Sequence, residues 1–473
     1  MSLRSTWLSA VADLLIAGCA VGPNYHRPDT PMPAAFKEAW QPAIPADEVP
    51  RGPWWKSYAD PTLTGLEGEA LHSNQTIRAA AAQYRAAAAA VGGTRAALFP
   101  TVSAGASSTR SSGFSGNNGS AAASGTGGAT TVDRLTASVD WELDLWGRLR
   151  RGLEQSRNAA EASAGDLAAV QLSVTATLAQ DYVQLRALDL QRELLARTVT
   201  AYQRSLQITQ NRYNAGVAQS TDLTQAQSQL ANAEAQAADL RVQRAPLEHA
   251  IATLAGKTPE EFALDPLAQL PTLPGVPSAV PAMLLERRPD VAAAERRVAS
   301  ANAAIGVARG AWFPTLSLSG TGGYQGSAWQ HLITVPARYW SVGPALAETL
   351  FDAGARHAQS AAARANYDAA VANYREAVLT ALKDAEDSLA TLRGLADQEK
   401  ATSRAALAAS ETLRVTENQY RAGTVSYLNV VIAQSSSLSA DNALINVQSR
   451  RLLAHISLLK ALGGMPETYP AAP

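Results

Sequence analysis

The sequence predicts a mainly α-helical protein with a small β part, built from two copies of one structural unit. The segment NRYNAGVAQSTDLTQAQ at 211–227 recurs as NQYRAGTVSYLNVVIAQ at 418–434, with the tyrosine, the Ala-Gly pair and the Ala-Gln pair in matching places. A proline-free run rich in helix-forming residues leads into each copy, from Arg148 and from Arg356. Each copy therefore predicts the tip of a helical hairpin, and the pair predicts an internal two-fold repeat.

Residues 1–18 resemble the signal peptide of a bacterial lipoprotein. An apolar run ends in Ile16-Ala17-Gly18-Cys19, with small residues directly before the lone cysteine. This resemblance implies that Cys19 is lipidated, for example with palmitate, and becomes the mature N-terminus. Asp13 departs from the pattern, because a carboxylate is costly in a segment that enters a membrane. Residues 19–60 are rich in proline and tryptophan and predict an extended tether with a few aromatic anchors.

Residues 61–258 are expected to form the first repeat. Asp60 and Pro61 predict the start of a short helix, as N-cap and first-turn residue. From Leu135 to Leu145 apolar residues alternate strictly with polar ones, which predicts a strand with one apolar and one polar face. The other expected elements are a helix over 74–98, a β-hairpin over 101–145, a long helix from 148 to 213, a tip near 214–220 and a return helix over 222–255.

A proline-rich linker over 259–281 is expected to join the first repeat to a second, over 282–465. ALFPTVSAG at 97–105 matches AWFPTLSLSG at 311–320, so each repeat passes from helix to strand at a Phe-Pro pair. The expected elements are a helix over 289–311, a β-hairpin over 314–350, a long helix from 356 to 420, a tip near 421–427 and a return helix over 427–462. Residues 466–473 are expected to form a C-terminal tail.

Composition and charge exclude several classes of function. A formal net charge of −1 gives no basic footprint for nucleic acid. The single cysteine supports neither a disulfide framework nor a cysteine metal cluster, and the six histidines lack metal-binding spacing. We therefore expect no metal, no cofactor and no nucleic-acid partner. The sequence also lacks an apolar run long enough for a transmembrane helix.

Four strands in one chain are too few to close a membrane barrel. An open sheet edge in lipid leaves backbone groups unpaired, at several kcal/mol each. Strands that span a membrane would therefore be shared between chains, and three chains would give a barrel of about 12 strands around a wet lumen. A soluble four-stranded sheet on a long helical stalk remains the alternative.

Five segments carry a further signal: CAVGPNYHRP (19–28), WELDLWGRLRR (141–151), RYNAGVAQSTDL (212–223), LLERRPDVAAAERRVASANAAIGVARGAWFPTLSLSG (284–320) and QYRAGTVSYLNVVIAQ (419–434). Together they resemble one family, the outer-membrane factor lipoproteins of bacterial efflux systems, in the NodT/OprM-like branch of the TolC channels. The resemblance implies a homotrimer in outer-membrane lipid, lipid-anchored and extended into the periplasm by a helical barrel. It implies a conduit for small molecules, such as drugs, rather than an enzyme. The implied partners are a periplasmic adaptor and an inner-membrane pump of the resistance-nodulation-division type.

The same resemblance implies roles for residues of the two tips. Adaptor docking falls on Arg212, Tyr213, Gly216, Arg421 and Gly423, and the aperture, or gate, falls on Asp222, Tyr420, Asn429 and Ile432. In the closed state a Tyr420–Asp222 hydrogen bond would link neighbouring tip helices. Val425 stands where some relatives carry an arginine, and Asn429 and Ile432 stand where some carry aspartates. Alternatively, Asp222 is only the N-cap of the return helix.

Three carboxylates on the polar face of the strand over 135–145, Asp140, Glu142 and Asp144, are expected to line the lumen near the barrel base. Two other functions stay open: a lipid-anchored coiled-coil scaffold or adhesin, and a type I protein secretion duct. The lipobox and the LLERRPD segment favour small-molecule efflux over protein secretion.

Overall fold

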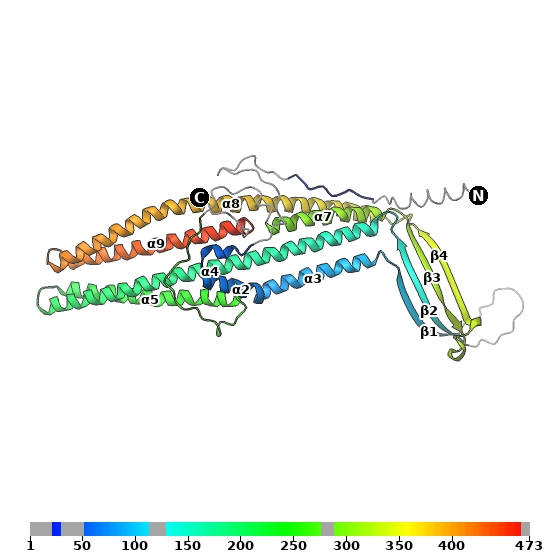
Figure 1. The fold of residues 1–473 in the computed structure, drawn as a ribbon, viewed down its shortest axis with the longest axis horizontal. Helices are drawn as coiled ribbons and strands as arrows, with labels where there is room; N and C mark the ends of the chain where they lie inside the picture. The colour runs from blue at the N-terminus through cyan, green and yellow to red at the C-terminus, as the bar shows by residue number, and fades with distance from the viewer. Residues whose placement is uncertain (1–20, 30–51, 113–128, 276–287, 465–473) are drawn as a thin grey trace. The chain divides into compact units, whose positions relative to one another are not determined.

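The computed structural model describes residues 21–29, 52–112, 129–275 and 288–464 (Figure 1). Two β-hairpins alternate with long helical hairpins along the chain. In order, the elements are η1 (Trp54–Tyr58), α2 (Pro61–Ser73), α3 (Gln75–Ala96), β1 (Thr101–Ser111), β2 (Thr130–Leu143), α4 (Arg148–Asn214), α5 (Ser220–Leu254), α7 (Pro289–Gly310), β3 (Thr315–Gly326), η2 (Trp329–His331), η3 (Val335–Ala337), β4 (Arg338–Ala347), α8 (Ala355–Arg421) and α9 (Tyr427–Ala461).

The helix ends follow local signals in the sequence. Each predicted helix is confirmed, with bounds that differ by only a few residues. The Asp60 carboxylate accepts a hydrogen bond from the Leu63 backbone N–H at 3.0 Å, which confirms Asp60 as the N-cap of α2. Pro246 lies inside α5 and removes one backbone donor there, without ending the helix.

The four strands form one antiparallel sheet in the order β1-β2-β3-β4. β2 and β3 pair from Asp133↔Gly326 to Leu143↔Leu316, so the central ladder joins the two halves of the chain. Because side chains alternate, the two faces of the sheet differ. The face called here the apolar face carries the row Val102, Val139, Gly320 and Val342, and the polar face carries the adjacent row Ser103, Ser138, Thr321 and Ser341. Within this chain β1 and β4 are both edge strands.

The chain divides into two compact units, described separately. One unit comprises residues 1–29, 85–162 and 295–373, and its described part contains the sheet. Its extended segment 21–29 packs on helices of the same unit. The Val21 backbone N–H donates to the Trp146 carbonyl at 3.0 Å, and Arg151 donates to the Asn24 side chain at 2.8 Å.

The second unit comprises residues 30–84, 163–294 and 374–473. Its main core gathers apolar side chains of η1, α2, α4, α5 and α9, including Leu63, Leu178, Ile251 and Ile456, each fully buried. Glu67 lies fully buried in the same unit with no hydrogen-bond partner for either carboxylate oxygen, and burial raises its pKa to about 9. The carboxyl group is therefore neutral at pH 7, which lowers the cost of burying it.

The prediction of an extended tether is wrong for its last residues. Trp54–Tyr58 form a 3-10 helix, and the rings of Trp54, Trp55 and Tyr58 are buried in the core. Tyr58 Oη lies 2.7 Å from Nδ1 of the buried His455. The burial of three aromatic side chains stabilises a turn that the proline-rich composition alone does not favour. Cys19 and the predicted signal peptide lie outside the described residues.

Every helix among the described residues is too short or too polar to cross a membrane.

Candidate functional site

Both tip turns have the same backbone conformation. After α4, Gly216 adopts φ 73°, its N–H donates to the Tyr213 carbonyl at 2.9 Å, and the Val217 N–H donates to the Arg212 carbonyl at 2.9 Å. After α8, Gly423 adopts φ 78°, with matching bonds from Gly423 to Tyr420 and from Thr424 to Gln419, each 3.0 Å. Both turns are Schellman motifs, which favour glycine at the left-handed position. A Cβ atom at either glycine would meet nothing within 4 Å, so φ alone requires glycine here.

Tyr420 is buried at the second tip and contacts the first. Its ring is 6% exposed and packs on the ring of Tyr427, with centroids 5.4 Å apart. The Arg212 guanidinium lies 4.7 Å from the centroid of the Tyr420 ring, and its Nη1 donates to the Tyr420 carbonyl at 3.0 Å. Arg212, predicted to dock a partner, thus joins α4 to α8 within the protomer by a cation–π contact and a charge-assisted hydrogen bond.

The apolar cluster around Tyr420 explains one departure from the family pattern. Val425 packs against this cluster, which contains Tyr420, Tyr427, Val430 and Val431. A valine at position 425 therefore adds apolar contact where some relatives carry an arginine. Burial raises the pKa of Tyr427; a side-chain hydrogen bond with Ser205 opposes this shift, and the nearby Tyr420 and Asp222 add to it.

The Tyr420 hydroxyl group has a weak partner within the protomer. Thr209 Oγ1 lies 3.4 Å away, at the limit of a hydrogen bond. Thr209 donates its single hydroxyl proton to the Ser205 carbonyl at 3.0 Å, so Tyr420 is the donor in the bond between the two hydroxyl groups. The phenol proton is consequently held loosely.

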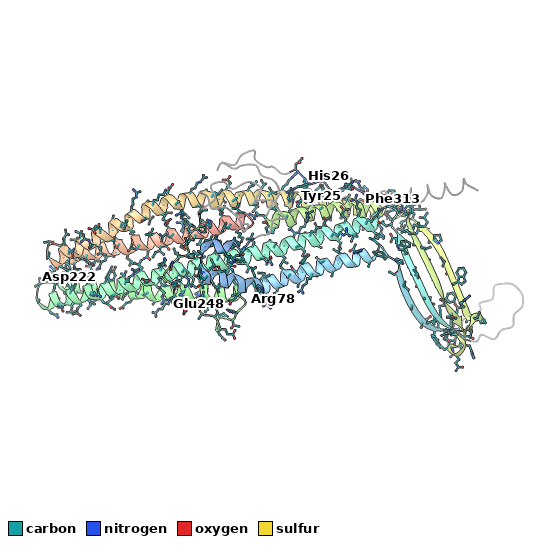
Figure 2. The ribbon with its side chains drawn as sticks, viewed as in Figure 1. Tyr25, His26, Arg78, Asp222, Glu248 and Phe313 are labelled. Carbon is teal, nitrogen blue, oxygen red and sulfur yellow. The ribbon has the colours of Figure 1, made fainter. Side chains whose placement is uncertain are left out.

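Asp222 lies in the first turn of α5, at the free end of the helix (Figure 2). The alternative that Asp222 is the N-cap is wrong, because α5 begins at Ser220 and its N-cap is Gln219, which makes no side-chain cap bond. Ser220, Thr221 and Asp222 are all favourable cap residues, and the chain enters the helix before the first of them. Among the described residues, the half-buried Asp222 carboxylate has neither a hydrogen-bond nor an ion-pair partner.

The other predicted tip residues lie at the surface of the protomer. Tyr213 is 42% exposed, and Gly216 and Gly423 are exposed. Arg421 is exposed and bonds residues of its own helix, with Asn418 at 3.1 Å and Glu417 at 3.4 Å. Asn429 and Ile432 are exposed on α9, and 59% of Ile432 is accessible. Six predicted residues are thus accessible in the protomer, in contrast to Tyr420: Tyr213, Gly216, Arg421, Gly423, Asn429 and Ile432.

Of the three carboxylates predicted to line a lumen, Asp140 and Glu142 lie on the polar face of β2, and Asp144 directly follows the strand. Asp140 is exposed, whereas Glu142 pairs with Arg148 at 2.6 Å. Asp144 accepts hydrogen bonds from the Leu149 and Arg150 backbone N–H groups at 3.1 and 2.9 Å, at the start of α4. Two of the three carboxylates therefore also anchor the passage from strand to helix, where a helix N-terminus favours negative charge.

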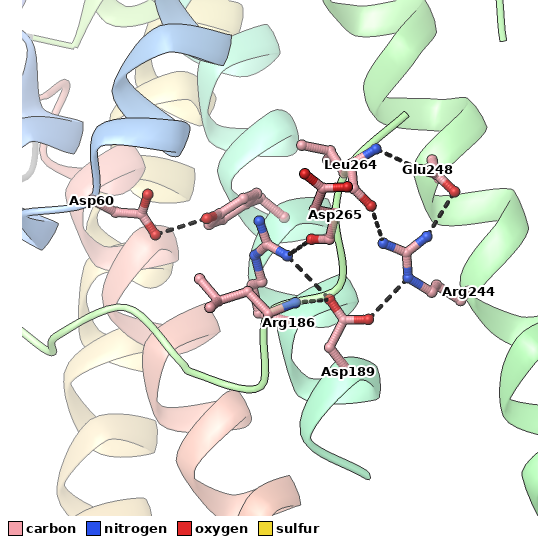
Figure 3. A network of polar contacts seen from close by, with 9 residues as sticks. Asp60, Arg186, Asp189, Arg244, Glu248, Leu264 and Asp265 are labelled. Carbon is pink, nitrogen blue, oxygen red and sulfur yellow. Dashed lines mark hydrogen bonds and ion pairs between the residues drawn. The ribbon is translucent and has the colours of Figure 1, made fainter. Parts of the chain in front are cut away.

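A buried polar network was missed in the sequence (Figure 3). Asp189 on α4 pairs with Arg186 at 3.1 Å and with Arg244 of α5 at 2.9 Å, and Arg244 also pairs with Glu248 at 2.7 Å. The segment after α5 is bound into the network, since Arg244 donates to the Leu264 carbonyl at 2.6 Å and Glu248 accepts from the Leu264 N–H at 2.7 Å. The pairs at 186 and 189 and at 244 and 248 have helical spacing that could have signalled them. The bonds that join α4, α5 and the segment after α5 connect residues far apart in sequence.

The chain combines long helices, accessible tips and a sheet with one apolar and one polar face. Among the described residues, no group of His, Cys, Asp and Glu side chains could hold a metal ion. The family described as outer membrane efflux protein matches residues 66–257 and 280–464. The toluene efflux pump outer membrane protein TtgC of Pseudomonas putida is 30% identical over 466 residues, covering 96% of this chain and 94% of the relative. The cation efflux system protein CusC of Escherichia coli is 28% identical over 457 residues, covering 95% and 96%. The solved structure of the outer-membrane channel OprN superposes with a TM-score of 0.85 at 32% identity, covering 94% of this chain and 99% of that one.

Proposed function

The chain belongs to the outer membrane efflux protein family, and we propose that it acts as a homotrimer in which three sheets close one barrel. It is the outer-membrane channel of a tripartite efflux system. The sheet is the observation that supports a trimer. It has four antiparallel strands, an apolar and a polar face, and an edge strand at each side. Pairing β1 of one protomer with β4 of the next would satisfy both edges and give about 12 strands.

Native mass and single-channel conductance test this assembly. The purified full chain is expected to have the mass of three protomers and to conduct ions in a planar bilayer. A monomeric protein without conductance would contradict the proposal. The expectation that no reaction is catalysed follows from the same role, since the relatives named above are channel or efflux proteins.

The exported cargo is proposed to be small molecules. One relative at 30% identity is named for toluene and another at 28% for cations, so similar channels serve chemically different cargoes. This favours small-molecule efflux over a scaffold, an adhesin or a protein secretion duct. It also supports a choice of cargo made outside the channel, which we assign to an inner-membrane pump of the resistance-nodulation-division type.

The tips are proposed to dock the periplasmic adaptor through their accessible residues, Tyr213, Gly216, Arg421 and Gly423. Arg212 is assigned a different part, because its guanidinium packs on Tyr420 inside the protomer. In-cell crosslinking from a photoreactive residue at position 213 is expected to capture a periplasmic adaptor. The same probe at the buried position 427 serves as the control and is expected to capture none.

The gate is proposed to form between neighbouring protomers, from the Tyr420 hydroxyl group and the Asp222 carboxylate. Two observations support the pair: the phenol proton has only a 3.4 Å partner within the protomer, and Asp222 is left without one among the described residues. A phenol–carboxylate hydrogen bond stabilises the closed state by roughly 1.5–3 kcal/mol. Tyr420→Phe and Asp222→Ala are each expected to raise single-channel conductance; unchanged conductance in both would remove the gate. The exposed Asn429 and Ile432 would line the same aperture.

The polar face of the sheet, with Asp140 and Glu142, is proposed to line the lumen, together with Asp144 just after β2. Asp140 is the exposed member of the three, so Asp140→Asn is expected to lower the preference of the open channel for cations. Cys19 is proposed to carry the lipid anchor. Mass spectrometry of the mature N-terminus tests that assignment, with an unmodified or uncleaved terminus contradicting it.

A further inference from the structure

A groove of about 700 Å³ lies on the apolar face of the sheet, near the end where β4 begins. Its lining includes Leu135, Ala137, Gly322, Tyr324, Arg338 and Trp340. Two successive rows of the apolar face form it. One row runs through Leu135, Tyr324 and Arg338, and the next through Ala137, Gly322 and Trp340. Ala137 and Gly322, the small residues of the second row, form the floor of the groove. The larger side chains of Leu135, Tyr324, Arg338 and Trp340 form its walls.

The groove lies at one border of the apolar band. On β2 this band extends from Leu143 to Leu135, about 27 Å of strand, close to the apolar band of about 25 Å in membrane barrels. Near the strand end that leads into the helices, Trp146 stacks on Phe313 with centroids 5.0 Å apart, as in an aromatic girdle. At the opposite end the band stops at Trp340, which is 74% exposed, followed on the same face by Arg338.

Arg338 gives the groove a positive charge at its outer rim. The side chain is exposed, and it has no ion-pair partner among the described residues. Asp133, a carboxylate in the next row of this face, lies two strands away on β2 and is 2% exposed. An apolar trough with an arginine at one end matches a molecule with a hydrocarbon chain and an anionic head.

We propose that this groove binds an acyl chain of lipid A, the phosphorylated glycolipid of the outer leaflet, with Arg338 on a phosphate group. The proposal rests on the proposed function, because it requires the sheet to span the outer membrane with its helical end toward the periplasm. The rim with Arg338 then lies at the outer leaflet. Arginine binds phosphate through paired N–H donors, and Trp340 beside it fits the membrane interface.

Native mass spectrometry of the purified full chain, titrated with diphosphoryl lipid A, tests the site. Arg338→Gln is expected to weaken lipid A binding about tenfold, within the range for a charge-assisted hydrogen bond, whereas Arg338→Lys retains most of it. Arg134→Gln is the matched control. Arg134 lies on the polar face and bonds Gln325 at 2.8 Å, so its loss is expected to leave lipid binding unchanged.

A second pair of variants tests the apolar part of the groove. A Cβ atom at Gly322 would meet its nearest neighbour at 3.9 Å, so Gly322→Leu fills the floor without strain and is expected to weaken binding at least tenfold. Gly320→Leu is the control on the same strand and face, outside the groove, where a Cβ atom would contact Val342 at 3.5 Å. Wild-type affinity in both Arg338→Gln and Gly322→Leu would overturn the site.

Two further measurements separate the lipid site from the channel itself. Phosphatidylglycerol is expected to bind several-fold more weakly than lipid A, and equal binding would overturn the assignment to the outer-leaflet lipid. Conductance is recorded on the same preparations. A channel that conducts normally but does not distinguish Arg338→Gln from wild type overturns the lipid site alone. A preparation that forms no channel overturns the proposed function and the lipid site together.

Discussion

At the first tip Tyr213 is 42% exposed, whereas its counterpart Tyr420 at the second tip is 6% exposed. The arginines differ in the opposite sense. Arg212 contacts the Tyr420 ring, and Arg421 bonds only its own helix and remains exposed. The backbone of the two turns is nonetheless the same, down to the pair of Schellman hydrogen bonds. A duplicated turn can therefore keep its backbone while its side chains diverge: the first tip exposes its tyrosine and packs its arginine, and the second packs its tyrosine and exposes its arginine.

The largest expected effect comes from removing the two tyrosines. Tyr420→Ala leaves a cavity in the cluster with Tyr427 and Val430 and is expected to destabilise that tip by about 3–5 kcal/mol. Tyr213→Ala removes an exposed side chain and is expected to cost less than about 0.5 kcal/mol. Hydrogen–deuterium exchange of the last turns of α4 and α8 measures both changes. Equal protection in the two variants would break the distinction between the tips.

The arginines give the next largest difference. Arg212→Ala removes the cation–π contact and the bond to the Tyr420 carbonyl and is expected to cost about 2 kcal/mol. Arg421→Ala removes exposed contacts within one helix, at about 0.5 kcal/mol or less. The same exchange experiment should show faster exchange at both tips for Arg212→Ala alone, since Arg212 joins the two helices. An effect confined to α4 would contradict that link.

The glycines should be equivalent where the other residues are not. Gly216→Ala and Gly423→Ala each place a Cβ at positive φ, at about 1 kcal/mol, and neither meets a neighbouring atom. Matched losses of local protection in the two variants would sharpen the comparison. A loss at only one turn would show that the backbones are less alike than their hydrogen bonds indicate.

The smallest expected effect is that of the Tyr420 hydroxyl group. In isolated protomers, Tyr420→Phe is expected to change local stability by less than about 1 kcal/mol, because the bond to Thr209 is 3.4 Å long. In the trimer the same substitution is expected to raise conductance, as proposed above. A large loss of stability in the protomer would place the hydroxyl group in the core rather than at the gate.

Much of the fold could be predicted from local sequence signals. Asp60 and Pro61, the Phe-Pro pairs and the tip glycines act on the residues next to them, and each correctly indicated the end of a helix or strand. The strict alternation after Leu135 likewise predicted a two-faced strand, because the pleat alone sets which side chains share a face.

The misses arise from contacts distant in sequence. Trp54 and Tyr58 pack into a core formed by α2 and by helices more than a hundred residues away, and this burial outweighs their proline-rich surroundings. Arg212 was predicted to dock a partner. Its guanidinium instead packs on Tyr420, a contact that cannot be read from the sequence near Arg212. The alternative that Asp222 is the N-cap of α5 was wrong for a different reason. Ser220, Thr221 and Asp222 are all favourable cap residues, and composition does not show where among them the helix begins.

The two open sheet edges have a consequence for genetics. In the proposed trimer, each subunit pairs through β1 with one neighbour and through β4 with the other. One unpaired edge is therefore enough to leave the whole barrel open. A co-expressed subunit that pairs through β1 but not through β4 would enter rings and leave them open. With equal expression and random mixing, only about one ring in eight would be wholly wild type. Substitutions that block pairing at one edge of this sheet should therefore be dominant over the co-expressed wild type. Substitutions that prevent the subunit from folding should be recessive, because such a subunit does not enter the trimer.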